Sequence, residues 1–278
     1  MRLTPYLLAV NLAMMAARPA LAQQRPLQAE PLAGVGEGNA SIALGADYTH
    51  NTQFTLSGLQ GDLWRLALIQ IDVGLSSIAD FELSGGLRDH LSIASTTAAP
   101  LSGELDLSNP NSTGAFDDII VATKVRVLAD QPERPGVALK FATRLPNAKH
   151  PSGLGQDTTD FFGTLILGHN VSGYEVLANA GLGVLGDPLR GNRRVESFLY
   201  SLMISRAVTD RISALVGLDG RTGPSEPGLE SRAIARIGVS RAQGPIRIRL
   251  DGTYGLTDRD GSVGFAINAT YTFHAFTP

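Results

Sequence analysis

Charged side chains at every second position form the clearest pattern for chemistry in this sequence. In residues 245–257, Arg247, Arg249 and Asp251 alternate with isoleucine and leucine. A period of two is typical of a β-strand, in which successive side chains point to opposite faces. One face of this segment is therefore apolar and the other ionic. Guanidinium and carboxylate groups held on one face can attract ions and polar solutes or bind them directly.

The same alternation elsewhere predicts a mixed ionic set on the inner face of the fold. Its basic members are Lys124, Arg126, Lys140, Arg144, Arg211, Arg232, Arg236, Arg247 and Arg249, and its acidic members are Asp47, Asp72, Glu82, Glu175, Glu196, Asp219 and Asp251. Strands late in the chain supply several arginines, so one wall is expected to be basic. Such a wall can attract anionic or polar solutes to a pore. Alternatively, ladders of opposite charge can fill a narrow interior and close it.

We take ten members of this set as candidates for contact with a permeating solute: Lys124, Arg126, Lys140, Arg144, Glu175, Arg232, Arg236, Arg247, Arg249 and Asp251. We expect no catalytic residues. The five histidines, among them His169 and His274, are dispersed and have no accompanying Gly-x-Ser-x-Gly motif or metal-ligand spacing. A lipase or esterase at the rim is therefore the weakest alternative. We also expect no metal and no cofactor.

The elements that must position these residues read as about twelve successive strands. They span residues 40–49, 63–74, 81–91, 118–129, 137–145, 159–169, 174–185, 195–207, 211–220, 229–241, 245–257 and 262–274. Both faces of 159–169 are partly apolar, so its register stays open. Short and long connections alternate between the strands, a rhythm that an up-and-down membrane barrel predicts and a soluble sandwich does not. The predicted fold is all-β, a transmembrane antiparallel barrel of about twelve strands over residues 39–278.

Targeting and composition agree with an exported protein. A basic start, a short apolar run and Ala20-Leu21-Ala22 predict a signal peptide over residues 1–22. Residues 23–38, rich in Pro, Gln and Gly, are expected to form a periplasmic N-terminal segment or a small plug. The sequence has no Cys, which excludes disulfides and thiolate metal sites, and its net charge of −3 argues against a nucleic-acid partner.

Several short motifs carry a resemblance to a known family. These are the stretch from Ser57 to Arg65, the Val73-Gly74-Leu75 step, Lys140, Leu145-Pro146, the glycines at 153 and 155, and Thr159-Asp160-Phe161. They resemble the outer-membrane transporter family named for the MetA pathway of phenol degradation, which is loosely similar to the fatty-acid and aromatic-hydrocarbon channel superfamily. The resemblance implies solute uptake without identifying a substrate.

The expected function is passive uptake of small molecules, including hydrophobic or aromatic ones, through a barrel in the bacterial outer membrane. The alternative is a non-conducting structural or surface barrel whose interior is closed by ion pairs. Expected partners are the lipid bilayer of the outer membrane, a small-molecule solute and the barrel-assembly machinery, which would recognise the aromatic C-terminal strand.

Overall fold

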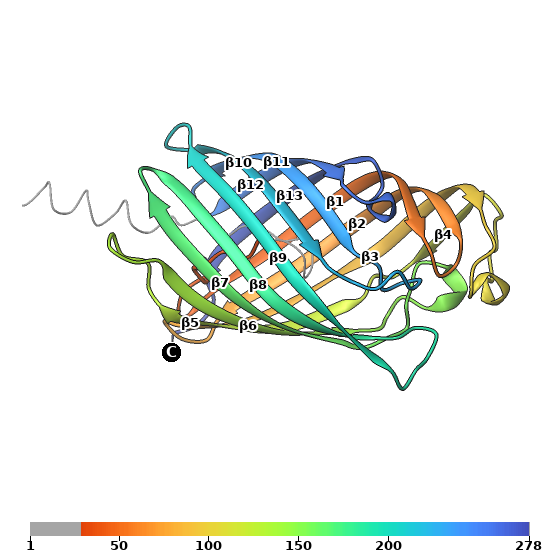
Figure 1. Cartoon of the computed structure of the whole chain (residues 1–278). Helices are drawn as coiled ribbons and strands as arrows, with labels where there is room; N and C mark the ends of the chain where they lie inside the picture. The colour runs from red at the N-terminus through yellow and green to blue at the C-terminus, as the bar shows by residue number, and fades with distance from the viewer. Residues whose placement is uncertain (1–28, 278) are drawn as a thin grey trace, which may run out of the picture.

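Twelve antiparallel strands form a closed barrel, as the sequence predicts (Figure 1). The computed structural model describes residues 29–277. A thirteenth short strand, β4, pairs with β3 toward the loop end, beyond the part of β3 that pairs with β5. The strands are β1 (Asn39–Phe54), β2 (Leu59–Gly74), β3 (Ala79–Thr96), β4 (Ser112–Ala115), β5 (Ile119–Leu128), β6 (Gly136–Leu145), β7 (Asp160–Val171), β8 (Tyr174–Gly186), β9 (Arg194–Ala207), β10 (Ile212–Arg221), β11 (Arg232–Gln243), β12 (Ile246–Gly255) and β13 (Val263–His274).

Pairing between the first and last strands closes the sheet, from Asn39 opposite His274 to Thr49 opposite Gly264. An even number of strands then places the start of β1 and the end of β13 at the end of the barrel with short turns. The turn between β7 and β8 consists of Ser172 and Gly173, both with positive φ (51° and 82°), a conformation that matches the twist of a tight hairpin. Longer connections, with the 3-10 helices η1 (Ser102–Glu104), η2 (His150–Ser152) and η3 (Asp258–Asp260), gather at the opposite end. No helix within residues 29–277 is long and apolar enough to cross a membrane.

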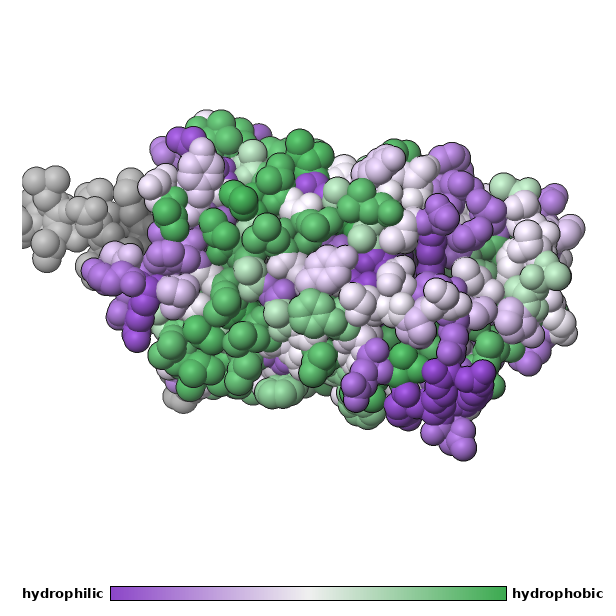
Figure 2. All heavy atoms as spheres, viewed as in Figure 1, coloured by the Kyte–Doolittle hydropathy of each residue, from purple (hydrophilic) through white to green (hydrophobic). Residues whose placement is uncertain are grey.

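The outer wall is apolar. In β12, Ile246, Ile248 and Leu250 are each nearly half exposed, whereas Arg249 is buried inside. Figure 2 shows apolar residues spread over the wall toward the short turns and hydrophilic residues dense near the long loops. An outward apolar band with a polar interior is the arrangement that a bilayer requires of a barrel.

Aromatic rings mark the two borders of this band. Trp64 lies against Tyr48 and Phe265 toward the loop end, with ring centroids 4.9 and 5.6 Å away. Tyr271 and Phe273 stack at 5.7 Å toward the turn end. Phe265 and Phe273 are eight residues apart in β13, which is about 27 Å along the strand. At a strand tilt of about 40° this corresponds to about 20 Å across the membrane, somewhat less than the apolar band of about 25 Å in membrane barrels.

Two details of the strands differ from the sequence prediction, and a third defines a register that the prediction left open. Most of the polar stretch 50–62, predicted as a loop, continues β1 and β2, which are joined by a tight turn at 55–58. Ala67 bulges from β2 with a φ of 52°, so Trp64 and Leu66 face outward before it and Ile69 and Ile71 after it. This change of parity explains why the start of the strand reads poorly in sequence.

The register of β7 is now defined. Phe161, Leu165 and Leu167 are exposed on the outer wall, whereas Phe162 and Ile166 are buried in the interior. Both faces are apolar because this part of the interior is itself packed with hydrocarbon. The prediction of a signal peptide over residues 1–22 concerns positions outside the described part of the chain.

Candidate functional site

The N-terminal segment 29–35 lies inside the barrel near the end with short turns. The backbone N–H of Ala29 donates to Oδ1 of Asp219 in β10 at 2.9 Å, and Lys140 in β6 donates to Glu30. Ala29, Glu30 and Leu32 are all buried. The segment is thus fixed to strands on two sides of the interior.

An ionic network holds this segment against β3, β5 and β6. Lys140 donates to Glu82 at 2.6 Å as well as to Glu30, and Lys124 lies 3.2 Å from Glu82 and 3.7 Å from Asp80. Lys124 and Lys140 are direct cross-strand partners. Like charges in that position repel each other, so the carboxylates beside them are needed to offset the repulsion.

Leu32 anchors the same segment through apolar packing. It belongs to a buried cluster inside the barrel whose other members are Ala29, Ala138, Ile166, Leu177, Met203 and Leu215. Two glycines make room for it. A Cβ on Gly136 would lie 2.1 Å from Leu32 Cδ2, and one on Gly168 would lie 2.9 Å from Leu32 Cβ. Glycine within a strand often marks such a close approach.

The part of the wall formed by strands late in the chain, which the sequence predicts to be basic, has its positive charges neutralised at its centre. Arg236 lies 3.4 Å from Asp219 and 4.0 Å from Asp251, and Arg249 lies 2.8 Å from Asp251. These four side chains are all nearly buried. Arginine and aspartate from β10, β11 and β12 therefore form an alternating network rather than a free cationic surface.

Three further candidates, Arg126, Glu175 and Arg247, lie near the turn end. Arg126 donates to the Ser77 carbonyl at 2.6 Å, Arg247 to the Ser240 hydroxyl at 3.3 Å, and Glu175 accepts from Ser205 at 3.0 Å.

Two residues of the wider ionic set were assigned wrongly to the interior, namely Arg211 and Glu196. Both are exposed. Arg211 belongs to the turn before β10. Glu196 faces outward, because its neighbour in the strand, Ser197, faces inward.

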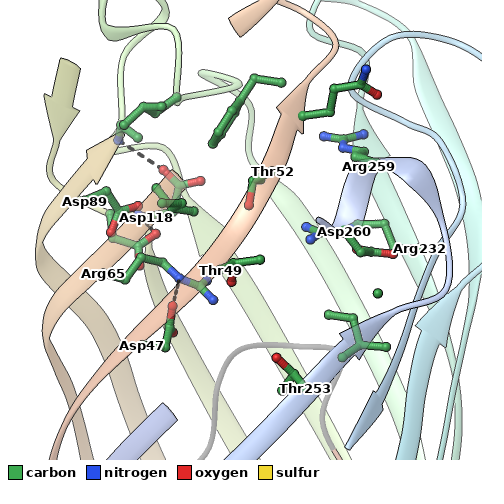
Figure 3. Close-up of a pocket in the computed structure, with 18 of the residues that line it drawn as sticks. Asp47, Thr49, Thr52, Arg65, Asp89, Asp118, Arg232, Thr253, Arg259 and Asp260 are labelled. Atoms are coloured by element: carbon green, nitrogen blue, oxygen red, sulfur yellow. Dashed lines mark hydrogen bonds and ion pairs between the residues drawn. The ribbon is translucent and has the colours of Figure 1, made fainter. Parts of the chain in front are cut away.

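A cavity of about 240 Å³ occupies the interior toward the loop end. Figure 3 shows Asp47, Asp89 and Asp118 with Arg65 on one side, and Arg232, Arg259 and Asp260 on the other. Arg65 binds Asp47 at 2.8 Å, and Arg232 binds Asp260 at 2.5 Å. A separate cavity of about 70 Å³ lies near the short turns beside Leu32 and Lys124.

Arg144 and Arg259 also line the larger cavity, which we call the outer cavity. Arg144 is held by Asp160 and lies 3.6 Å from Asp118, and Arg259 pairs with Glu230. Burial, together with the neighbouring Arg232, lowers the pKa of Arg259, which lies in the loop helix η3, to about 10.

The sequence prediction missed Arg221, which it assigned to a loop. Arg221 is the last residue of β10, lines the outer cavity and is 8% exposed. Continuing the alternation by one step from the inward Asp219 would have placed it on the inner face.

Four of the five histidines contact groups other than serine hydroxyls. Nδ1 of His50 lies 2.7 Å from Asp62, and Nδ1 of His169 lies 2.7 Å from Asp130 in the turn after β5. His150 contacts the Gln156 carbonyl at 2.8 Å, and His274 contacts Asn39 at 3.3 Å. Hydrogen bonds from His169 and Asn170 outweigh burial and lower the pKa of Asp130.

The fold is similar to that of solved outer-membrane β-barrels. The COG4313 outer membrane channel from Pseudomonas putida F1 is similar over 92% of this chain and 100% of its own, with a TM-score of 0.61 and 11% identity. The KdgM porin, solved with oligogalacturonate, gives a TM-score of 0.51 and 8% identity over 84% of this chain and 99% of its own. The NanC porin also gives 0.51 and 8%, over 83% and 98%. No protein-family model and no curated protein sequence matches the chain.

Proposed function

We propose that this protein is an outer-membrane channel that admits small solutes passively. The observation that carries the proposal is a closed barrel with an apolar outer band and a cavity of about 240 Å³ lined by charged side chains. The similarity of the fold to channels and porins supports it. The cavity is smaller than pockets for drug-sized ligands, which favours solutes of low mass, including hydrophobic or aromatic ones. We assign no enzymatic activity to it.

In this proposal the chain reaches the bacterial outer membrane by way of the signal peptide over residues 1–22. The barrel-assembly machinery would recognise the C-terminal strand β13, which carries Tyr271 and Phe273. Membership of the MetA-pathway transporter family is part of the same proposal. The N-terminal segment acts as a small plug that narrows the path, because Glu30 and Leu32 hold it inside the barrel against strands β6 to β10.

A planar lipid bilayer tests the proposal directly. Purified full-length protein should produce discrete conductance steps in salt solution. The same protein reconstituted into vesicles should let small uncharged and charged solutes cross, as measured by swelling. A bilayer that stays sealed after verified insertion would contradict the channel.

The second candidate function is a non-conducting structural barrel. The buried ion pairs around Lys140 and Arg236 favour it, because such networks fill an interior. A sealed bilayer together with high resistance to heat would support this alternative.

A further inference from the structure

Arg221 is the charged group of the outer cavity whose environment is least balanced. Its cross-strand partner is Arg232, and like charges placed directly opposite each other are destabilising. Arg232 is compensated by Asp260 at 2.5 Å. Within residues 29–277, no carboxylate oxygen lies within 4 Å of the Arg221 guanidinium, and its Nε is buried without a hydrogen-bond partner.

Among the described residues, the Arg221 guanidinium makes one hydrogen bond, to a neutral group. Its Nη2 donates to the Gly228 carbonyl at 3.2 Å, and the same carbonyl accepts from Gln156 Nε2 at 2.7 Å. Asp160, which also lines the cavity, is already engaged by Arg144 and by the backbone N–H of Gly186. A buried charge without a counter-charge is costly, so the position suits a group that binds an external anion.

We propose that Arg221, with Arg232 and Arg259 beside it, binds the carboxylate of a small organic acid in the outer cavity. A guanidinium group matches a carboxylate in both charge and shape. The inference rests on the proposed channel for its purpose, since a selective site at the entrance would enrich anionic solutes. The binding itself is measurable without conduction.

Apolar side chains next to this site indicate what the rest of the ligand resembles. The cavity is also lined by Phe54, Leu56, Ile120, Leu154 and Phe162. Leu229, which follows the Gly228 contact, packs in a buried cluster with Ile120 and Phe162. Such a wall gains from covering a hydrocarbon or aromatic body and gains nothing from a hydrated inorganic anion. The ligand class is therefore a small carboxylate with an apolar body.

Isothermal titration of the detergent-solubilised full-length protein tests the site. Benzoate is the probe, benzamide the neutral isostere, and acetate and inorganic phosphate are anions without an apolar body. Benzoate should bind at least about tenfold more tightly than each of the other three, because a charge-assisted contact and apolar burial both contribute. Equal binding of benzoate and benzamide would overturn the role of charge, and phosphate binding as tightly as benzoate would overturn the ligand class.

Variants separate the site from general effects on the barrel. Arg221→Gln should weaken benzoate binding at least about tenfold, and Arg221→Lys should retain part of it. Arg241→Gln, which changes an exposed arginine at the other end of β11, should bind as the wild type does. Because it removes an uncompensated buried charge, Arg221→Gln should keep wild-type resistance to heat. Unchanged benzoate binding by folded Arg221→Gln would refute the proposal.

Failure of the carboxylate site can be distinguished from failure of the proposed channel. A sealed bilayer with benzoate binding that depends on Arg221 would remove the channel and keep the site. Conductance in a protein that binds no benzoate would keep the channel and remove the site.

Discussion

Lys140 shows how a single residue can link the N-terminal segment to the barrel wall. Its ammonium group contacts Glu30 of the segment and Glu82 of β3, and all three side chains are nearly buried. Each partner has been taken out of water, so the geometry of the contacts decides the net contribution to stability. Removal of the cation would leave two carboxylates facing each other in the interior.

Lys140→Met should lower the free energy of unfolding by about 3–5 kcal/mol, because it removes the cation of a buried ion pair and leaves Lys124 alone to offset Glu30 and Glu82. Urea titration of the protein folded in lipid vesicles measures this change. Lys149→Met is the matched control, since Lys149 pairs with Asp157 at 2.8 Å in an exposed loop. An exposed pair contributes about 1 kcal/mol or less. Equal losses for the two variants would contradict the buried network.

At the scale of elements, the strands β6 and β7 are shaped by the segment that packs inside them. Gly136 and Gly168 face the interior where Leu32 lies, and the cluster around Leu32 includes residues of β6 to β10. The segment and these strands are thus fitted to each other. Displacing Leu32 should free the segment without altering the outer wall.

Gly168→Ala should raise single-channel conductance severalfold, because the new Cβ would lie 2.9 Å from both Leu32 Cβ and Leu177 Cδ2 and would push the segment away from β7 and β8. Planar-bilayer recording checks this. Gly163→Ala in the same strand is the control, since its Cβ would meet a ring carbon of Phe141 at an ordinary 3.8 Å. A folded Gly168→Ala protein with wild-type conductance would show that the segment does not narrow the path.

The whole molecule is organised by three environments: lipid outside, an ionic and partly apolar interior, and water at both ends. The exposed apolar side chains of β11, β12 and β13 alternate with inward charges and amides. Aromatic rings lie at the borders of the apolar band. A bilayer accounts for this division, because water would favour polar side chains on the outer wall.

A charge on the outer wall should therefore cost more in the middle of a strand than in a turn. Ile237→Arg, at a position that is 66% exposed in the middle of β11, should lower the free energy of unfolding by about 2–4 kcal/mol in lipid vesicles. Val208→Arg, equally exposed at 64% in the turn before β10, should cost about 0–1 kcal/mol. Urea titration of both variants measures the difference, and equal costs would contradict a membrane-embedded wall.

The barrel was predictable because its signal is local. Ile246, Arg247 and Ile248 alternate within a few residues, and the same alternation recurs along the chain between short and long connections. Periodicity also placed Lys124, Lys140, Arg144, Arg236 and Arg249 on the inner face. By contrast, it failed at the Ala67 bulge and in β7, because one extra residue reverses parity and an apolar interior removes the contrast between the two faces.

The strands, most of their faces and the class of fold were evident from the sequence alone, because each depends on neighbouring residues. Which charges pair with each other became visible only in the folded barrel. Glu30 meets Lys140 and Asp219 meets Ala29 across 110 and 190 residues. The tertiary structure also revealed that Arg221 faces the outer cavity opposite Arg232 and that no carboxylate among the described residues forms an ion pair with it. Such contacts depend on closure of the barrel and on the register of every intervening strand, which no local pattern encodes.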